Sequence, residues 1–251
     1  MASAKDILVK VINSHSARGL IAKFHYSGKS TQNSQLHFGV FLNGKLEGCL
    51  QFGPPIDRRK MLPLVTGSKW GEMIELNRMA FGPKLPKYSE SRAIAICFKL
   101  IKKHYPQIKW VVSFADGCQC GDGTIYRASG FYLTAINKNK TMLLMPDGTI
   151  KADKTLNDHP VKKSGWWKRN GATPINGFQL RYIYFIDKSY KEKLTVPILP
   201  FSEIDKRGAG MYKGTASTVQ SRRVTKANSG DQLESGGAIP TNTLQSSEAI
   251  K

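Results

Sequence analysis

Residues 72–116, EMIELNRMAFGPKLPKYSESRAIAICFKLIKKHYPQIKWVVSFAD, decide the fold. Residues 72–81 have the composition of a strand, and residues 88–106 carry apolar side chains at the three- and four-residue spacing of a helix. Ser89 is expected to cap that helix. Residues 109–116 are almost continuously apolar, as a strand buried on both faces should be. This order predicts a right-handed crossover unit, in which the helix begins beside the carboxyl edge of the strands.

Residues 36–53, LHFGVFLNGKLEGCLQFG, predict an antiparallel hairpin. Two apolar runs flank Asn43-Gly44, a dipeptide that favours the positive φ angles of a two-residue type I′ turn. Residues 54–71 are rich in proline, glycine and charge, which indicates a connecting loop. The pattern predicts further elements as follows: a strand at 7–12, a helix at 15–29, a short helix at 123–130, and strands at 131–137, 141–146 and 180–186.

Together these elements predict a mixed α/β domain over residues 1–195. Its central sheet should be splayed and mostly antiparallel, with one parallel pair and flanking helices. Residues 196–251 are expected to form an extended, mostly disordered tail, because the sequence becomes rich in Ser, Thr, Gly and Gln and loses its apolar content.

The formal net charge of +20 indicates a polyanionic partner. Residues 1–204 alone carry 31 basic and 14 acidic side chains, so the excess belongs to the folded part. The alternative is a basic protein without such a partner. No apolar run reaches the roughly 18 to 20 residues of a membrane span, and the N-terminus does not have the pattern of a signal peptide. The four cysteines do not suggest a disulfide framework, so a reducing cytoplasm is the expected compartment.

The predicted helix start at residues 86–92 is a candidate phosphate site. A helix N-terminus presents unpaired backbone N–H groups and a positive dipole end. The side chains that would add charge or hydroxyl groups are Lys87, Ser89, Ser91 and Arg92. Ordinary helix capping is the alternative explanation.

Polar residues with catalytic chemistry occur in two further places. Asp116 ends the buried strand and Tyr126 follows on the short helix; a carboxylate can accept a proton from an attacking amine, and a phenol can donate one. The alternatives are a turn-capping aspartate and a core tyrosine. His25 and Tyr26 lie near the predicted end of the first helix, where a lone histidine is more often a core or surface residue.

Two clusters concern nucleic acid and metal. Trp166, Trp167, Lys168 and Arg169 combine stacking faces with cations, as flipped-base or single-strand contacts require. An aromatic pair anchored at the surface is the alternative. Cys118 and Cys120 have no second cysteine pair, which argues against structural zinc.

Taken in order, these motifs resemble the Mom DNA-modification proteins of Mu-like phages, within the GNAT acyltransferase superfamily. The residues that carry the resemblance are His25-Tyr26-Ser27, Glu75-Leu76-Asn77-Arg78, the helix start at Ser91, Ser113-Phe114-Ala115-Asp116, and Gly123-Thr124-Ile125-Tyr126 with Ala128-Ser129. The resemblance covers residues 5–190. It implies a GNAT-like fold and carbamoylmethylation of adenine in double-stranded DNA, which protects phage DNA from restriction.

The resemblance also assigns roles by position. It implies that His25, Tyr26, Asp116 and Tyr126 are catalytic. It places Arg78 and Ser91 at the donor site, with Lys87, Ser89 and Arg92 beside them. Iron is implied as a candidate metal, with His25 and Asp116 as the residues that could bind it.

The donor is left open, because the segment GPKLPKYSESR lacks the glycines of the usual acetyltransferase pyrophosphate loop. A coenzyme A thioester and a charged tRNA are the two candidates. Two rival functions follow from the same residues. An ordinary GNAT N-acetyltransferase would act on a protein or a small amine and would bind coenzyme A tightly. A non-catalytic DNA-binding protein would bind DNA without needing Asp116.

Overall fold

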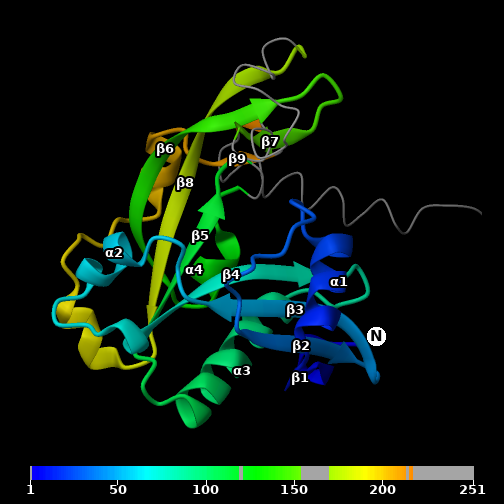
Figure 1. The fold of residues 1–251 in the computed structure, drawn as a ribbon, viewed down its shortest axis with the longest axis vertical. Coiled ribbons are helices and arrows are strands. Elements are labelled where there is room, and N and C mark those ends of the chain that lie inside the picture. Colours follow the sequence, from blue (N-terminus) through cyan, green and yellow to red (C-terminus); the bar gives the residue numbers. More distant parts are fainter. Residues whose placement is uncertain (1, 119–120, 154–169, 213–214, 217–251) are drawn as a thin grey trace, which may run out of the picture. The chain divides into compact units, whose positions relative to one another are not determined.

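The computed structural model describes residues 2–118, 121–153, 170–212 and 215–216. Residues 1–217 form one compact unit, and residues 218–251 lie outside the described residues. The unit contains the strands β1 (Leu8–Val11), β2 (Leu36–Leu42), β3 (Lys45–Gly53), β4 (Met73–Phe81), β5 (Trp110–Asp116), β6 (Tyr132–Leu144), β7 (Ile150–Ala152), β8 (Thr173–Phe185), β9 (Met211–Tyr212) and β10 (Thr215–Ala216). Its α-helices include α1 (Ser14–Phe24), α2 (Arg58–Met61), α3 (Ser89–His104), α4 (Thr124–Ala128) and α7 (Ser202–Lys206) (Figure 1).

Eight strands form one sheet in the order β1-β2-β3-β4-β5-β8-β6-β7. The pair β4 and β5 is parallel, and the other neighbours in this sheet run antiparallel. The parallel ladder extends only from Met73↔Trp110 to Leu76↔Ser113, after which the two strands diverge (Figure 1). Beyond that point β4 stays paired with β3, and β5 stays paired with β8 as far as Asp116. The predicted fold class, a splayed and mostly antiparallel sheet with one parallel pair, is confirmed.

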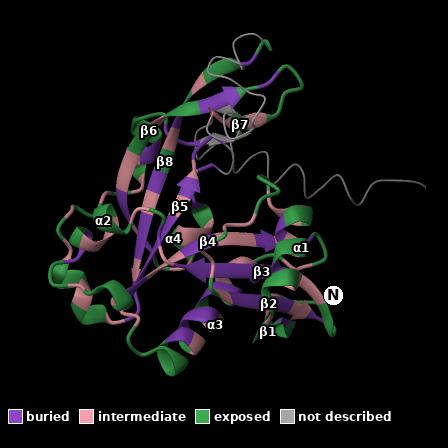
Figure 2. Cartoon of the chain, in the orientation of Figure 1, coloured by how far each residue is buried: buried purple, intermediate pink, exposed green. Residues whose placement is uncertain are grey.

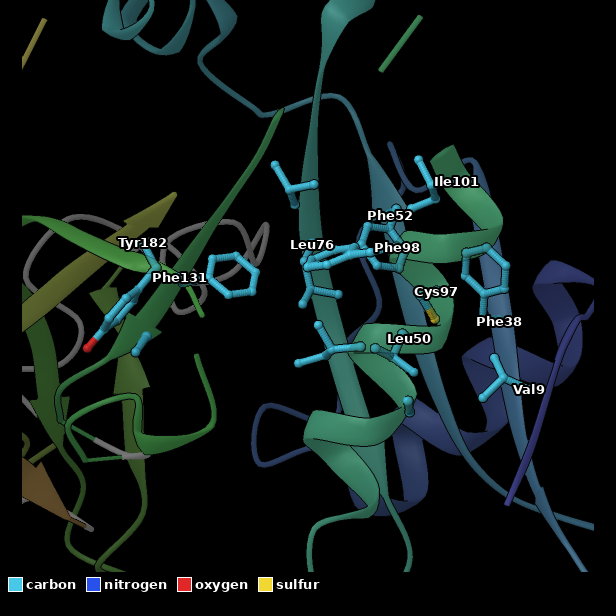
Figure 3. Packing of buried hydrophobic residues seen from close by; sticks show 14 of the residues in the cluster. Val9, Phe38, Leu50, Phe52, Leu76, Cys97, Phe98, Ile101, Phe131 and Tyr182 are labelled. Carbon is cyan, nitrogen blue, oxygen red and sulfur yellow. The ribbon is translucent and has the colours of Figure 1, made fainter. Parts of the chain in front are cut away.

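Helices α1 and α3 cover opposite faces of this sheet. Successive strand residues point to opposite faces. Cys49 of β3 packs with α1, whereas its neighbour Leu50 belongs to the large core beneath α3. Figure 3 shows Phe98 of α3 directed at this core, and its ring lies 6.4 Å from that of Phe52. The central strands β2 and β3 are buried and the outer sides of the helices are exposed (Figure 2).

The hairpin prediction is confirmed, including its turn. Asn43 and Gly44 have φ angles of 50° and 76°, as a type I′ turn requires, and Leu42 pairs with Lys45. The two strands predicted at 131–137 and 141–146 are instead the single strand β6, whose register shifts between Asn139 and Met142. Pairing with the equally long β8 keeps this polar stretch extended, although its composition suggested a break.

The compact unit continues beyond residue 195, the predicted end of the domain. Ile204 of α7 is 2% exposed and Ala209 is fully buried. Leu199 N–H donates to the Leu133 carbonyl at 2.8 Å, which fastens this segment to β6. The apolar residues of this segment are interrupted by prolines and charged residues, so they show no helix or strand periodicity that would mark a folded segment in the sequence. The disordered tail remains a prediction for residues 217–251.

The predicted loop at 54–71 contains short helical turns: α2 and the 3-10 turns Leu62–Leu64 and Trp70–Glu72. Leu64 and Val65 pack against Trp110 and Val112 of β5, on the face opposite α3. Among the described helices, none is both long enough and apolar enough to span a membrane.

Candidate functional site

The point where β4 and β5 diverge is marked by a β-bulge at Asn77. Gln51 pairs with Arg78 while the next residue of β3, Phe52, pairs with Leu76, so Asn77 is the extra residue. Bulges often occur beside active sites, where they redirect a side chain. Asn77 is 6% exposed, and its Oδ1 accepts a hydrogen bond from the Ser34 hydroxyl at 3.1 Å. Its amide nitrogen is buried without a well-formed hydrogen bond to any described residue.

Glu75 lies one pair before the end of the parallel ladder, opposite Gly53 on one side and Val112 on the other. Burial raises the pKa of this carboxyl to about 7, and the nearby Asn77 amide and Arg78 guanidinium counter this only in part. A carboxylate with a pKa near the working pH is suited to general base catalysis. In the sequence, Glu75 stood out only as part of the motif that carries the family resemblance. The missed signal is an acidic residue between Ile74 and Leu76, inside a predicted strand.

Arg78 fastens the segment 27–35 over this part of the sheet. Its Nε donates to the Lys29 carbonyl at 3.1 Å, and its Nη1 donates to the carbonyl of Asn77 at 2.7 Å. Ser30 reaches the same strands, because its hydroxyl donates to Gln51 Oε1 at 2.8 Å. The structure therefore places Arg78, a predicted donor-site residue, in contact with the covering segment. Its donor role remains a prediction.

His25 and Tyr26 follow α1 and lie next to Arg78. Burial and the positive charge of Arg78 lower the pKa of His25 to about 4, so its ring is neutral near pH 7. His25 Nδ1 accepts the Ser27 N–H at 3.1 Å and lies 2.8 Å from the Ser27 hydroxyl. The ring proton is therefore at Nε2. The Tyr26 ring is 54% exposed, with its centroid 4.2 Å from that of His25, so the pair presents a polar and aromatic surface.

Asp116 ends β5 on the same face as Glu75. Val112 and Phe114 belong to the cluster on the face opposite α3, and strand alternation continues that face to Asp116. Its Oδ1 accepts the Cys118 N–H at 2.9 Å. Burial raises the pKa of Asp116 despite that hydrogen bond. Asp116 therefore caps a turn, as the structural explanation expected. Its raised pKa also keeps it a candidate for a catalytic role.

Tyr126 lies on the opposite face, together with α3 and α4. The Ser113 hydroxyl, which is fully buried, lies 3.0 Å from the Tyr126 hydroxyl and 2.9 Å from the carbonyl of Leu76. The Tyr126 ring stacks on Tyr182 at a centroid distance of 5.0 Å. This packing holds the phenol at the level of the last β4–β5 pair. Tyr126 is therefore both part of the core and close to the point of divergence.

The first turn of α3 holds most of the predicted donor-site residues. The structure assigns Tyr88, with φ of 70°, as the N-cap in place of Ser89. The buried Ser89 hydroxyl therefore caps nothing, and it has no hydrogen-bond partner among the described residues. Ser91 donates to the Tyr88 carbonyl at 3.2 Å, and Arg92 reaches the Lys5 carbonyl at 3.5 Å.

An unpaired buried polar group in a native protein calls for an explanation. In the described part of the chain Ser89 Oγ meets that description, whereas Asn77 Nδ2 lies beside the Glu75 carboxyl and lowers its pKa without forming a well-shaped hydrogen bond. Asn77 lies on β4 at its divergence from β5, and Ser89 at the start of the helix that connects these strands. The Ser89 hydroxyl is therefore the candidate for contact with a ligand. Lys87 is exposed in the loop before α3.

The predicted nucleic-acid cluster, Trp166, Trp167, Lys168 and Arg169, lies outside the described residues. Within the described part, no group of three or more His, Cys, Asp or Glu residues is arranged to hold a metal ion. His25 and Asp116 therefore lack a third such residue for the iron site that the resemblance implied.

Comparison with known proteins adds an independent observation. The model of the Mom protein family matches residues 6–203. The chain is 33% identical to "Methylcarbamoylase mom" of Escherichia phage Mu over 202 residues, which cover 78% of this chain and 82% of the relative.

Two of the solved structures that the chain resembles are acetyltransferases. One is a GNAT family acetyltransferase from Elizabethkingia anophelis with acetyl-CoA bound, with a TM-score of 0.42, 15% identity, and coverage of 72% of this chain and 98% of that one. Another is the IAA acetyltransferase from Bacillus cereus, with a TM-score of 0.44, 9% identity, and coverage of 71% and 99%.

Proposed function

The chain belongs to the Mom protein family, and from this membership we propose that it transfers a carbamoylmethyl group to the exocyclic amine of adenine in DNA. The relative from phage Mu is named a methylcarbamoylase, and the net charge of +20 suits a polyanionic substrate. The function is protection of phage DNA from restriction nucleases.

One observation carries the chemical part of the proposal. Glu75, a carboxyl with a pKa of about 7, lies one pair before the point where β4 and β5 diverge, on the same face as Asp116. The amine of adenine is a weak nucleophile because its lone pair is delocalised into the ring. Its reaction requires the base outside the helical stack and a group that accepts the amine proton.

Residues on the two faces of the sheet have different roles in the reaction. On the α1 side, Glu75 accepts the amine proton, and Asp116, four residues beyond the Val112 that pairs with Glu75, accepts a hydrogen bond from a more distant part of the substrate. His25 and Tyr26 bound the base from the end of α1. On the α3 side, Tyr126 protonates the leaving group of the donor. For a glycyl ester or thioester donor, a bond forms between the amine nitrogen and the carbonyl carbon, while the bond from that carbon to the leaving oxygen or sulfur breaks with its electron pair. The resulting glycyl amide is an isomer of the carbamoylmethyl group, so an intramolecular rearrangement completes the modification.

The donor binds at the start of α3, where the unpaired Ser89 hydroxyl and the first-turn N–H groups face a phosphate or carbonyl. Glu90 lies in the same turn, and its negative charge repels a strongly charged anion. Lys87 and Arg92 supply the compensating charge. This arrangement suits a coenzyme A thioester or the terminal phosphates of a charged tRNA.

Nucleoside mass spectrometry of DNA from producing cells tests the proposal. Wild-type protein should yield a modified deoxyadenosine with the added mass of a carbamoylmethyl group. Glu75→Gln should reduce its amount at least a hundredfold. Lys102→Ala, on the exposed end of α3, is the matched control and should leave it unchanged. Unmodified adenine in cells with folded wild-type protein would refute the proposal.

A further inference from the structure

An open pocket of about 520 Å³ lies beside the segment that covers Gly53. It is lined by Asn33, Pro54, Pro55, Ile56, Asp57, Arg58, Arg59 and Trp70. Its volume is within the range of sites that hold a small molecule or a nucleotide. The two prolines fix the backbone of one wall, so this wall is formed before a ligand arrives.

The pocket exposes apolar side chains that a folded protein normally covers. Ile56 is 82% exposed and Trp70 is 53% exposed. The Arg58 guanidinium lies 5.8 Å from the centre of the Trp70 ring. An exposed indole with a guanidinium beside it is the combination on which nucleic-acid bases stack.

The charge of the pocket is positive. Asp57, its carboxylate, is already engaged: it forms an ion pair with Lys60 at 2.9 Å and accepts the Lys60 N–H at 3.2 Å. Within the described part of the chain, Arg58 and Arg59 form no ion pair with a carboxylate. Two guanidinium groups are therefore available to phosphate oxygens, which they bind in bidentate fashion.

Hydrogen bonds connect the pocket to the bulge in β4. The Asn33 amide donates to the Pro54 carbonyl, and the next residue, Ser34, donates to Asn77 Oδ1. Pro54 follows Gly53, which is the cross-strand partner of Glu75. The pocket therefore adjoins the segment that lies over Gly53, the cross-strand partner of Glu75.

We propose that this pocket binds the nucleotide that flanks the modified adenine, with its base stacked on Trp70 and its phosphates held by Arg58 and Arg59. The proposal rests on DNA as the substrate of the neighbouring site. It assigns to residues 54–59 and Trp70 a role in holding the strand while the target base is out of the stack.

The test measures binding of the full-length protein to a short fluorescein-labelled DNA duplex by anisotropy, at several salt concentrations between about 50 and 200 mM. Trp70→Ala should weaken binding about tenfold without changing the salt dependence, and Trp70→Phe should restore most of it. The double variant Arg58→Ala/Arg59→Ala should lower the slope of log K against log salt by about two. The control Lys102→Ala/Lys103→Ala removes the same charge from the far end of α3 and should change neither quantity.

Equal affinity of the Trp70→Ala and wild-type proteins, or an equal loss in the lysine control, would overturn the proposal. A 2-aminopurine placed beside the target adenine should lose fluorescence on binding to wild-type protein but not to Trp70→Ala. Nucleoside analysis of wild-type cells judges the proposed function separately. If cells contain modified adenine but the pocket variants bind DNA normally, the proposed role of the pocket is wrong and the proposed function stands. If binding depends on the pocket but no modified adenine forms, the proposed function is wrong and the role of the pocket in DNA binding stands.

Discussion

At the scale of single residues, two carboxyl groups lie half-buried on one face of the sheet near the divergence of β4 and β5, and their surroundings differ. Asp116 accepts a backbone N–H, whereas the Asn77 amide and the Arg78 guanidinium stabilise the Glu75 charge less than burial disfavours it. A buried carboxyl without full compensation keeps its proton at higher pH. Glu75 therefore destabilises the folded protein when it is ionised, which is the usual consequence of a residue retained for chemistry.

The substitution Asp116→Asn removes the negative charge of the side chain and keeps its shape. The asparagine carbonyl can still accept the Cys118 N–H, so folding and DNA affinity should be unchanged. Modified adenine should fall about tenfold or more, because an uncharged acceptor binds the substrate more weakly. Nucleoside mass spectrometry and a thermal melt measure the two effects. A normal amount of modified adenine would remove Asp116 from the mechanism.

Glu75→Gln should raise the stability of the protein in a pH-dependent way. The folded protein holds the Glu75 proton to a pKa of about 7, against an ordinary value of 4.5, so the free energy of unfolding falls as the pH rises between these values. Removing the charge should therefore stabilise the protein by about 3 kcal/mol at pH 8 and by little at pH 4. Urea unfolding at both pH values measures this. The exposed Glu192→Gln is the control, and equal stability of the Glu75→Gln and wild-type proteins at pH 8 would contradict the buried carboxyl.

At the scale of elements, the segment 27–35 determines the environment of Glu75, and Gly53 permits its approach. A Cβ at Gly53 would lie 2.2 Å from the Asn33 carbonyl oxygen and 2.8 Å from Asn77 Oδ1. Gly53→Ala should therefore displace the segment, cost about 1 to 3 kcal/mol of stability, and reduce DNA modification.

Gly71→Ala is the matched control, because no atom lies within 4 Å of its added Cβ. It should leave both stability and modification unchanged. Thermal unfolding and nucleoside analysis of the two variants, side by side, measure the effects. Full modification by a Gly53→Ala protein would show that the position of the segment does not matter.

The same elements show what sequence alone can predict. The crossover unit and the turn at Asn43-Gly44 follow from local periodicity and turn chemistry, and both are confirmed. The segment that covers Glu75 is held by a hydrogen bond from Arg78 to the Lys29 carbonyl, and these two residues are 49 positions apart in sequence. No local pattern encodes such a contact. The pKa of Glu75 and the bulge at Asn77 were therefore visible only in the structure.

At the scale of the whole molecule, the packing of residues 199–209 fixes where the folded unit can end. Phe201 stacks near Tyr182, and Ile204 is almost fully buried. A chain that stops before residue 198 should lose about 3 kcal/mol or more of stability, since each large apolar side chain contributes roughly 1.5 to 3 kcal/mol when buried. A chain that stops after residue 217 should be as stable as the full chain. Denaturant unfolding of the two truncations distinguishes them, and equal stability would show that α7 contributes nothing.

The position of β5 in the sheet has a consequence for synthesis on the ribosome. One neighbour of β5, β4, precedes it closely in sequence, but the other, β8, begins only at Thr173. Until β8 has emerged, a nascent chain carries an apolar strand with an open edge, which is a template for aggregation. The long interval between these two partners makes the unfinished protein a client for chaperones, and a fragment that ends at Asp116 should accumulate in inclusion bodies.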